Sequence, residues 1–159
     1  PRLNGFLFWL QQLIAESLGK NEKGFLPLIS QAPKDHHSLL QLYLSGPKDK
    51  IFYIFSEEIH KQNSIKLFTK NFNKNVKFLN NKNLNQIKKA QKISFIKALK
   101  LNKTPFREFQ IKKINEETLG ELFSYFILEI SIIGKLSNIN PFNQPSVEQV
   151  KVNTKNILS

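Results

Sequence analysis

The sequence contains no cysteine and no methionine, and only two of its 24 basic residues are arginine. Without cysteine the chain can form neither a disulfide nor a thiolate-ligated metal site. No apolar run approaches the roughly 20 residues that a membrane-spanning helix needs. The start also lacks the charged, apolar and small-residue pattern of a secretory signal. These absences predict a soluble, cytoplasmic protein without a membrane partner.

The missing methionine also bears on completeness. A translated chain begins with Met, whereas this sequence begins with Pro1. We therefore expect a fragment, a trimmed product or an incomplete sequence of a longer protein. The 159 residues fit one domain by length, with enough apolar residues for a core.

The net charge of +12 comes almost entirely from lysine. Lysine, asparagine, isoleucine and phenylalanine are all abundant, and all four have A- and T-rich codons, so a biased genome can produce this composition. We favour a solvated lysine-rich surface, which attracts phosphorylated substrates. The alternative is a basic nucleic-acid-binding domain. Lysine is a poor base reader because bidentate contacts to guanine favour arginine, so we expect no nucleic-acid partner.

The spacing of apolar residues predicts strands that alternate with helices. Helices are expected over residues 1–18, 38–45 and 84–99, after Asn115, and from Ser146; strands over 25–30, 51–55 and 106–114; and a surface excursion over 60–82. Such alternation favours an α/β fold, a three-layer sandwich with a mainly parallel sheet, followed by C-terminal helices.

Three local signals mark the ends of these helices. Gly19 is placed to end the first helix at its C′ position. Asn115 is expected to cap the long helix, whose first turn is acidic. The pair Ser146 and Gln149 forms a capping-box pattern that predicts the start of the last helix.

Glu16 falls in the last turn of the first expected helix, with Gln12 one turn earlier on the same face. A carboxylate in such a position can transfer a proton between neighbouring carbons, and positioned proton transfer is worth roughly 10²–10⁴ in rate. The ring of His37 titrates near neutral pH and suits acid–base work. Lys151 and Gln144 flank a helix start, where an anion can bind. Each residue taken singly is better explained as exposed surface.

Taken together, these residues resemble the C-terminal portion of bacterial glucose-6-phosphate isomerases. The resemblance rests on segments 9–20, 35–38, 118–123 and 140–145, which occur in the family order, with 21 positions between Glu16 and His37. Two departures are visible, since Asn143 replaces the usual aspartate and Ser146 the usual glycine.

The resemblance implies roles for the candidate residues. Glu16 corresponds to the base that moves the substrate proton, and His37 to the ring-opening histidine. His37 is chosen over His36 because it directly precedes a small residue, as in the family. Lys151 corresponds to the lysine that assists at the ring oxygen. The matching glutamines, Gln12 and Gln144, bind substrate, the latter through its phosphate.

The resemblance also implies a domain organisation. Residues 1–159 would form one C-terminal sugar-isomerase (SIS) domain of a longer enzyme: a leading helix 1–18, an α/β core 19–114 and C-terminal helices 115–159. The family's first SIS domain, with its phosphate loop, and an enediolate-stabilising arginine have no match here, and Arg107 is no substitute. We therefore expect the chain to be inactive alone.

The complete enzyme is expected to be a homodimer that isomerises a sugar phosphate without cofactor or metal, each histidine serving the neighbouring subunit's site. An alternative is a non-catalytic SIS-type module that binds sugar phosphates; the presence of all three candidate catalytic residues argues against it.

Overall fold

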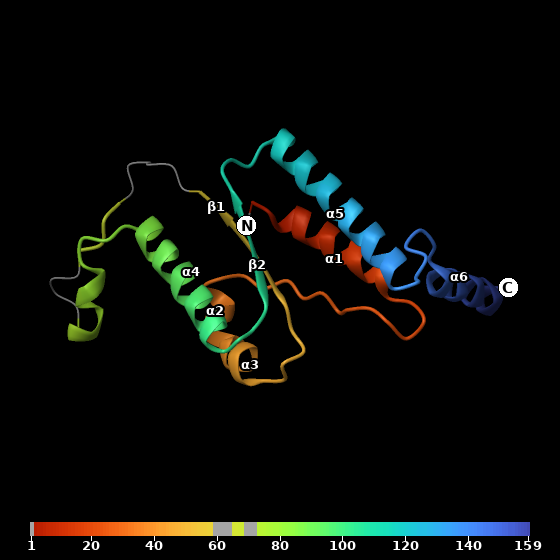
Figure 1. Ribbon diagram of the computed structural model, residues 1–159, viewed down its shortest axis with the longest axis horizontal. Helices are drawn as coiled ribbons and strands as arrows, with labels where there is room; N and C mark the ends of the chain where they lie inside the picture. The colour runs from red at the N-terminus through yellow and green to blue at the C-terminus, as the bar shows by residue number, and fades with distance from the viewer. Residues whose placement is uncertain (1, 59–64, 69–72) are drawn as a thin grey trace. The chain divides into compact units, whose positions relative to one another are not determined.

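The computed structural model describes residues 2–58, 65–68 and 73–159. The helices and strands of these residues are α1 (Asn4–Leu18), α2 (Lys34–Ser38), α3 (Leu40–Ser45), β1 (Phe52–Glu57), the 3₁₀ helix η1 (Lys74–Leu79), α4 (Leu84–Leu101), β2 (Phe106–Ile111), α5 (Glu116–Leu136) and α6 (Pro145–Leu158) (Figure 1). They form two compact units: unit 1 comprises residues 1–29 and 114–159, and unit 2 comprises residues 30–113.

Unit 1 is built on the packing of α1 against α5. The apolar stripe of α1 buries Phe6, Leu10 and Leu18, and α5 contributes Phe126 and Ile130. Aromatic rings pack between the two helices, where the ring centroids of Phe6 and Phe126 are 5.9 Å apart. These helices, which are distant in sequence, form the scaffold on which the end of α1 is positioned.

The long helix begins where the sequence predicts. The side chain of Asn115 accepts a hydrogen bond from the backbone N–H of Thr118, and Glu116 and Glu117 lie in the first turn. An N-cap of this kind satisfies one of the free N–H groups at the helix start. The last helix, α6, is different, because all of its residues are exposed.

Unit 2 is built around a parallel pair of strands. β1 and β2 are aligned from Phe52 beside Phe106 to Glu57 beside Ile111. Helix α4 covers one face of this pair: Phe95 meets Phe52 edge-on at 5.7 Å. Lys92 donates to Glu108 at 2.7 Å on the same face. Helix α4 itself starts with a complete capping box.

The opposite face of the pair carries alternate residues of both strands. Phe55 stacks on Phe109 at 4.8 Å. The guanidinium of Arg107 lies 5.1 Å from the Tyr53 ring and 5.3 Å from the Phe109 ring. Arg107 therefore takes part in an aromatic cluster on this face of the sheet, and its catalytic role is not tested by this packing.

Three local predictions are wrong. No strand forms over residues 25–30. A strand needs a paired neighbour; here Pro27 has no backbone N–H to offer, and its carbonyl accepts a bond from the side chain of Gln11. Helix α6 starts at Pro145 rather than being capped by Ser146, because proline suits the first helical position.

The third correction concerns Gly19. It is the C-cap residue, with a φ of −77°, rather than a left-handed C′ residue. Its small size is what matters, because a Cβ there would lie 2.6 Å from the Ala15 carbonyl oxygen. The first helix therefore ends on a residue that has no room for a side chain.

The chain folds as a mixed α/β structure with a two-stranded parallel sheet within the described residues, which confirms the class and the parallel pairing. The three-layer sandwich and the single-domain organisation stay predictions. The excursion expected over 60–82 lies partly outside the described residues, and its described part contains η1 and an isolated bridge between Lys66 and Asn83. No described helix is long and apolar enough to cross a membrane.

Candidate functional site

The candidate base, Glu16, is held by two side-chain amides. The Nε2 of Gln12 donates to Glu16 Oε1 at 2.8 Å. The Nε2 of Gln144 donates to the other oxygen, Oε2, also at 2.8 Å. The two glutamines therefore bracket the carboxylate, one donor to each oxygen. Three of the five residues expected at the site are thus brought together.

Helix geometry explains the first of these contacts. Residues four positions apart lie one above the other on a helix, which places Gln12 over Glu16. Leu18, two residues further on, is turned about 200° around the axis and is buried. The apolar side of α1 therefore faces the core, while Glu16 stays at its solvent-facing edge.

The loop after α1 is tightly closed. Gly24 has a φ of +119°, and a Cβ there would lie 2.8 Å from the Leu18 carbonyl oxygen. This conformation strongly favours glycine. The loop presents two lysines to the segment after α5: Lys20 Nζ donates to the Asn140 carbonyl at 2.6 Å, and Lys23 Nζ donates to the Ser137 carbonyl at 3.1 Å. Neither lysine was among the residues expected at the site.

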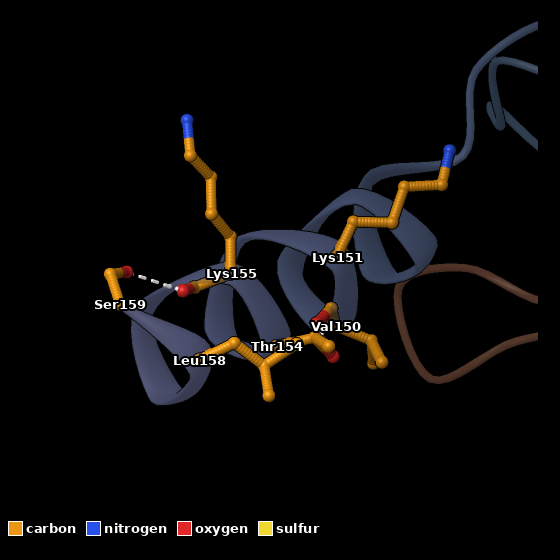
Figure 2. A pocket seen from close by; sticks show the side chains of 6 residues that line it. All are labelled: Val150, Lys151, Thr154, Lys155, Leu158 and Ser159. Carbon is orange, nitrogen blue, oxygen red and sulfur yellow. Dashed lines mark hydrogen bonds between the residues drawn. The ribbon is translucent and has the colours of Figure 1, made fainter.

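Lys151 lies in the second turn of α6, as expected. Its ammonium pairs with the Glu148 carboxylate at 2.7 Å, one turn earlier, and both side chains are 65% exposed. A shallow hollow lies against α6, and Figure 2 shows Lys151 and Lys155, two of the residues that line it, extending outward from the helix. The residues that line this hollow all come from α6 and its C-cap, Ser159. A hollow formed by one helix cannot enclose a sugar phosphate.

The two neighbouring histidines differ in their surroundings. The ring of His36 packs on Phe95 at 4.7 Å between centroids. Burial lowers the pKa of His36, although the nearby Asp35 carboxylate opposes this shift. His37 lies beside it on the short helix α2, with no ring contact of this kind among the described residues. His36 is thus partly packed within unit 2, whereas the neighbouring His37 is exposed.

The five candidate residues are thus divided between the units. Glu16, Gln12 and Gln144 form one cluster in unit 1, and Lys151 lies on α6 of the same unit, paired with Glu148. His37 belongs to unit 2. Within the ranges that the structure describes, no three histidine, aspartate or glutamate side chains gather in a way that could hold a metal ion.

Comparison with known proteins gives matches over nearly the whole chain. It is 38% identical over 144 residues to the glucose-6-phosphate isomerase of Methanocaldococcus jannaschii, a match that covers 90% of this chain and 35% of that one. It is 35% identical over 160 residues to the glucose-6-phosphate isomerase of Mycoplasmopsis pulmonis, covering 96% of this chain and 36% of the relative. The chain therefore spans about a third of the length of these relatives.

A solved structure supports the fold. The crystal structure of a hypothetical protein, TT0462 from Thermus thermophilus, superimposes with a TM-score of 0.86 at 27% identity, over 99% of this chain and 39% of that one. No family model matches the sequence. The sequence matches nonetheless agree with the resemblance that the motifs indicate: this chain is homologous to glucose-6-phosphate isomerases, over about a third of their length.

Proposed function

We propose that this chain is the C-terminal portion of a cytoplasmic isomerase that interconverts glucose 6-phosphate and fructose 6-phosphate in glycolysis and gluconeogenesis. The observation that carries the proposal is the Glu16 carboxylate, held by Gln12 and Gln144 at 2.8 Å each. Homology to enzymes with this name over 90% of the chain supports it.

The reaction requires one base that serves two adjacent carbons. In our proposal, Glu16 removes a proton from the carbon next to the carbonyl, which gives an enediolate. It returns the proton to the former carbonyl carbon while the hydroxyl proton passes between the two oxygens. The two amides suit this role because they orient the carboxylate without offering it an acidic proton. When a Glu16 oxygen accepts the substrate proton, its hydrogen bond from the amide weakens, because a neutral carboxyl group is a poorer acceptor than a carboxylate.

The remaining residues complete the proposal. His37 opens the sugar ring, and Lys151 assists at the ring oxygen after exchanging Glu148 for substrate. The complete enzyme is a homodimer in which His37 serves the neighbouring subunit's site. β1 and β2 belong to a larger parallel sheet in a three-layer SIS-type sandwich, within one C-terminal domain. No cofactor is needed, because the reaction moves only protons.

A chimaeric enzyme tests the proposal. The matching third of the Methanocaldococcus jannaschii isomerase is replaced by this chain, and fructose 6-phosphate formation is measured in a coupled assay. We expect the chimaera to be active, and the 159-residue chain alone to be inactive. Pre-placed donors must stabilise the enediolate charge, and losing one such donor costs roughly 10²–10³ in rate.

Two variants of the chimaera supply the controls. Glu16→Gln is expected to abolish isomerisation while substrate binding persists, whereas Glu22→Gln, which changes an exposed glutamate of the adjacent loop, should leave activity unchanged. A folded chimaera without activity, or one whose activity survives Glu16→Gln, would overturn the proposal.

A further inference from the structure

Few contacts of the neighbouring residues support the hydrogen bond between Gln144 and Glu16. Asn143, Gln144 and the whole of α6 are exposed. Helix α6 also lacks a side-chain cap at its N-terminus. A single exposed hydrogen bond between side chains contributes only about 1 kcal/mol. Some other contact must therefore fix the segment that carries Gln144.

Buried Ile139 anchors the chain just before Asn140, and Lys20 adds a directed contact at Asn140 itself. The Lys20 ammonium donates to the Asn140 carbonyl at 2.6 Å, four residues before Gln144. The side chain of Asn140 in turn accepts from the backbone N–H of Phe142 at 2.9 Å, so that the backbone between them is turned. The carbonyl that Lys20 holds therefore belongs to a locally ordered turn that leads directly to Gln144.

Lys20 is itself held in place by the backbone. It directly follows Gly19, whose Cα lies 2.8 Å from the position that a Cβ on Gly24 would occupy. Such closeness allows only glycines at both ends of the loop. The loop therefore fixes the origin of the Lys20 side chain, four residues after Glu16.

Electrostatics separates Lys20 from its neighbour Lys23. Burial lowers the pKa of Lys20, and attraction to the Glu16 carboxylate opposes that shift. Lys20 thus lies within electrostatic range of the candidate base. Lys23 is exposed and donates to Ser137, seven residues before Gln144. The two lysines share a loop and a bonding pattern, yet only Lys20 links Glu16 and the segment of Gln144.

We propose that Lys20 is a positioning residue for the candidate base: its ammonium holds the Asn140 carbonyl and thereby sets the Gln144 amide on the Glu16 carboxylate. The inference rests on the proposed function for its catalytic consequence, but its structural content concerns this chain alone. Small displacements of a reacting group can lower a rate roughly 100-fold.

The structural test uses the 159-residue chain. Side-chain amide resonances of Gln144 are followed by NMR in the wild type, in Lys20→Met and in the matched control Lys23→Met. We expect Lys20→Met to shift the Gln144 amide to the values of a free glutamine and to remove its contact with Glu16, while Lys23→Met leaves both unchanged. An unaltered Gln144 amide in a folded Lys20→Met chain would overturn the proposal.

The catalytic test uses the active chimaera. Lys20→Met should lower kcat roughly 10- to 100-fold with little change in KM, and equally for cyclic and open-chain substrates, because Glu16 acts on both. Lys20→Arg should recover much of the loss, since it keeps a cationic donor. A loss confined to KM, or full activity in Lys20→Met, would contradict the positioning role.

The two tests separate this inference from the proposed function. An inactive wild-type chimaera would count against the isomerase, while the Gln144 amide would still decide whether Lys20 positions it. If the Lys20→Met chain does not fold, the test uses Lys20→Gln instead. Glutamine removes the charge but keeps a hydrogen-bond donor on a shorter side chain. The same displaced Gln144 amide is then expected, and an undisturbed one would overturn the proposal.

Discussion

The two units of this chain differ sharply in charge. Unit 1, with residues 1–29 and 114–159, has six basic and seven acidic residues, whereas unit 2, with residues 30–113, has eighteen basic and five acidic residues. The whole excess of positive charge therefore belongs to unit 2. The carboxylate cluster around Glu16 lies in the nearly neutral unit.

This difference shows that the unit with the larger net charge is not the unit that holds the hydrogen-bonded Glu16 cluster. The Glu16 cluster is defined by the hydrogen bonds of 2.8 Å that Gln12 and Gln144 donate to the carboxylate, next to the 2.6 Å bond from Lys20 to the Asn140 carbonyl. Exposed lysines of unit 2 contribute a field that salt screens within about 10 Å at 0.1 M. They can attract a phosphorylated ligand, but orientation depends on the directional contacts in unit 1.

The largest expected effect tests whether the units have separate chemical roles. In the active chimaera, His37→Ala should lower turnover of the cyclic sugar by roughly 10²–10⁴ and spare an open-chain substrate. Glu16→Gln should abolish both, because ring opening and proton transfer are different steps. Coupled assays with the two substrates measure this, and equal losses in His37→Ala would remove His37 from ring opening.

Mixing the two inactive variants extends this test to the dimer. If each histidine serves the other subunit, a hybrid dimer of Glu16→Gln and His37→Ala has one site with both groups intact. Random exchange between two-fold dimers then restores about a quarter of wild-type activity. No recovery after verified subunit exchange would place both residues in the same chain's site.

The second prediction compares the two cores. Phe126 in unit 1 and Leu99 in unit 2 are fully buried. Phe126→Ala should cost about 3–5 kcal/mol and Leu99→Ala about 2–5 kcal/mol, because each leaves a cavity. Hydrogen exchange of α1 and α5 should rise in the first variant, and that of α4 in the second. Faster exchange throughout the chain in both variants would show one cooperative structure.

The third prediction compares one helix cap in each unit. The Asn115 side chain accepts from the Thr118 N–H at 3.1 Å. The Asn83 side chain accepts from the Gln86 N–H at 2.9 Å, and the Asn83 N–H donates to the Gln86 side chain. Alanine at either asparagine should cost about 1 kcal/mol of unfolding free energy. The two losses should be similar, because alanine at residue 83 removes only the side-chain acceptor and leaves the backbone N–H able to donate to the Gln86 side chain. Urea unfolding measures this, and an unchanged midpoint in either variant would contradict it.

The smallest predicted effect is the pH dependence of unit 2. Burial lowers the pKa of His36 below its unfolded value of about 6.5, so the unfolded chain binds the proton more readily. The contribution of His36 to the free energy of unfolding is complete above about pH 6.5. It falls as the pH drops through about 6.5 towards the pKa of the folded state. Urea midpoints between about pH 7.5 and 5.5 should fall in the wild type and in His37→Gln, but less in His36→Gln. An equal slope in His36→Gln would contradict this.

The elements that the sequence predicts well are those with strong periodicity. Helices α4 and α5 and strands β1 and β2 follow from the spacing of their apolar residues, and Asn115 caps α5 as expected. The strand over residues 25–30 failed because pairing depends on a second segment, which a local pattern cannot reveal. The start of α6 was also predicted wrongly, because the helix begins at Pro145 and not after a cap at Ser146.

The candidate site was predictable to different degrees. The bond between Gln12 and Glu16 follows from helical spacing alone. The bond between Gln144 and Glu16 joins positions that no local rule connects, and only the family resemblance suggested that they share a site. The role of Lys20 left no signal, because its acceptor is a backbone carbonyl, which every residue possesses.

The Gln144–Glu16 bond spans 128 positions of the sequence, which has a consequence for the timing of synthesis. A ribosome adds about 5–20 residues per second, so Gln144 is made roughly 6–25 seconds after Glu16. Helix α1 can form in about a microsecond, but its partner α5 does not yet exist. The nascent chain therefore carries an exposed apolar stripe until α5 is made, and its Glu16 carboxylate lacks the second amide until Gln144 is made. Within this chain, the carboxylate cluster is among the last features to be completed.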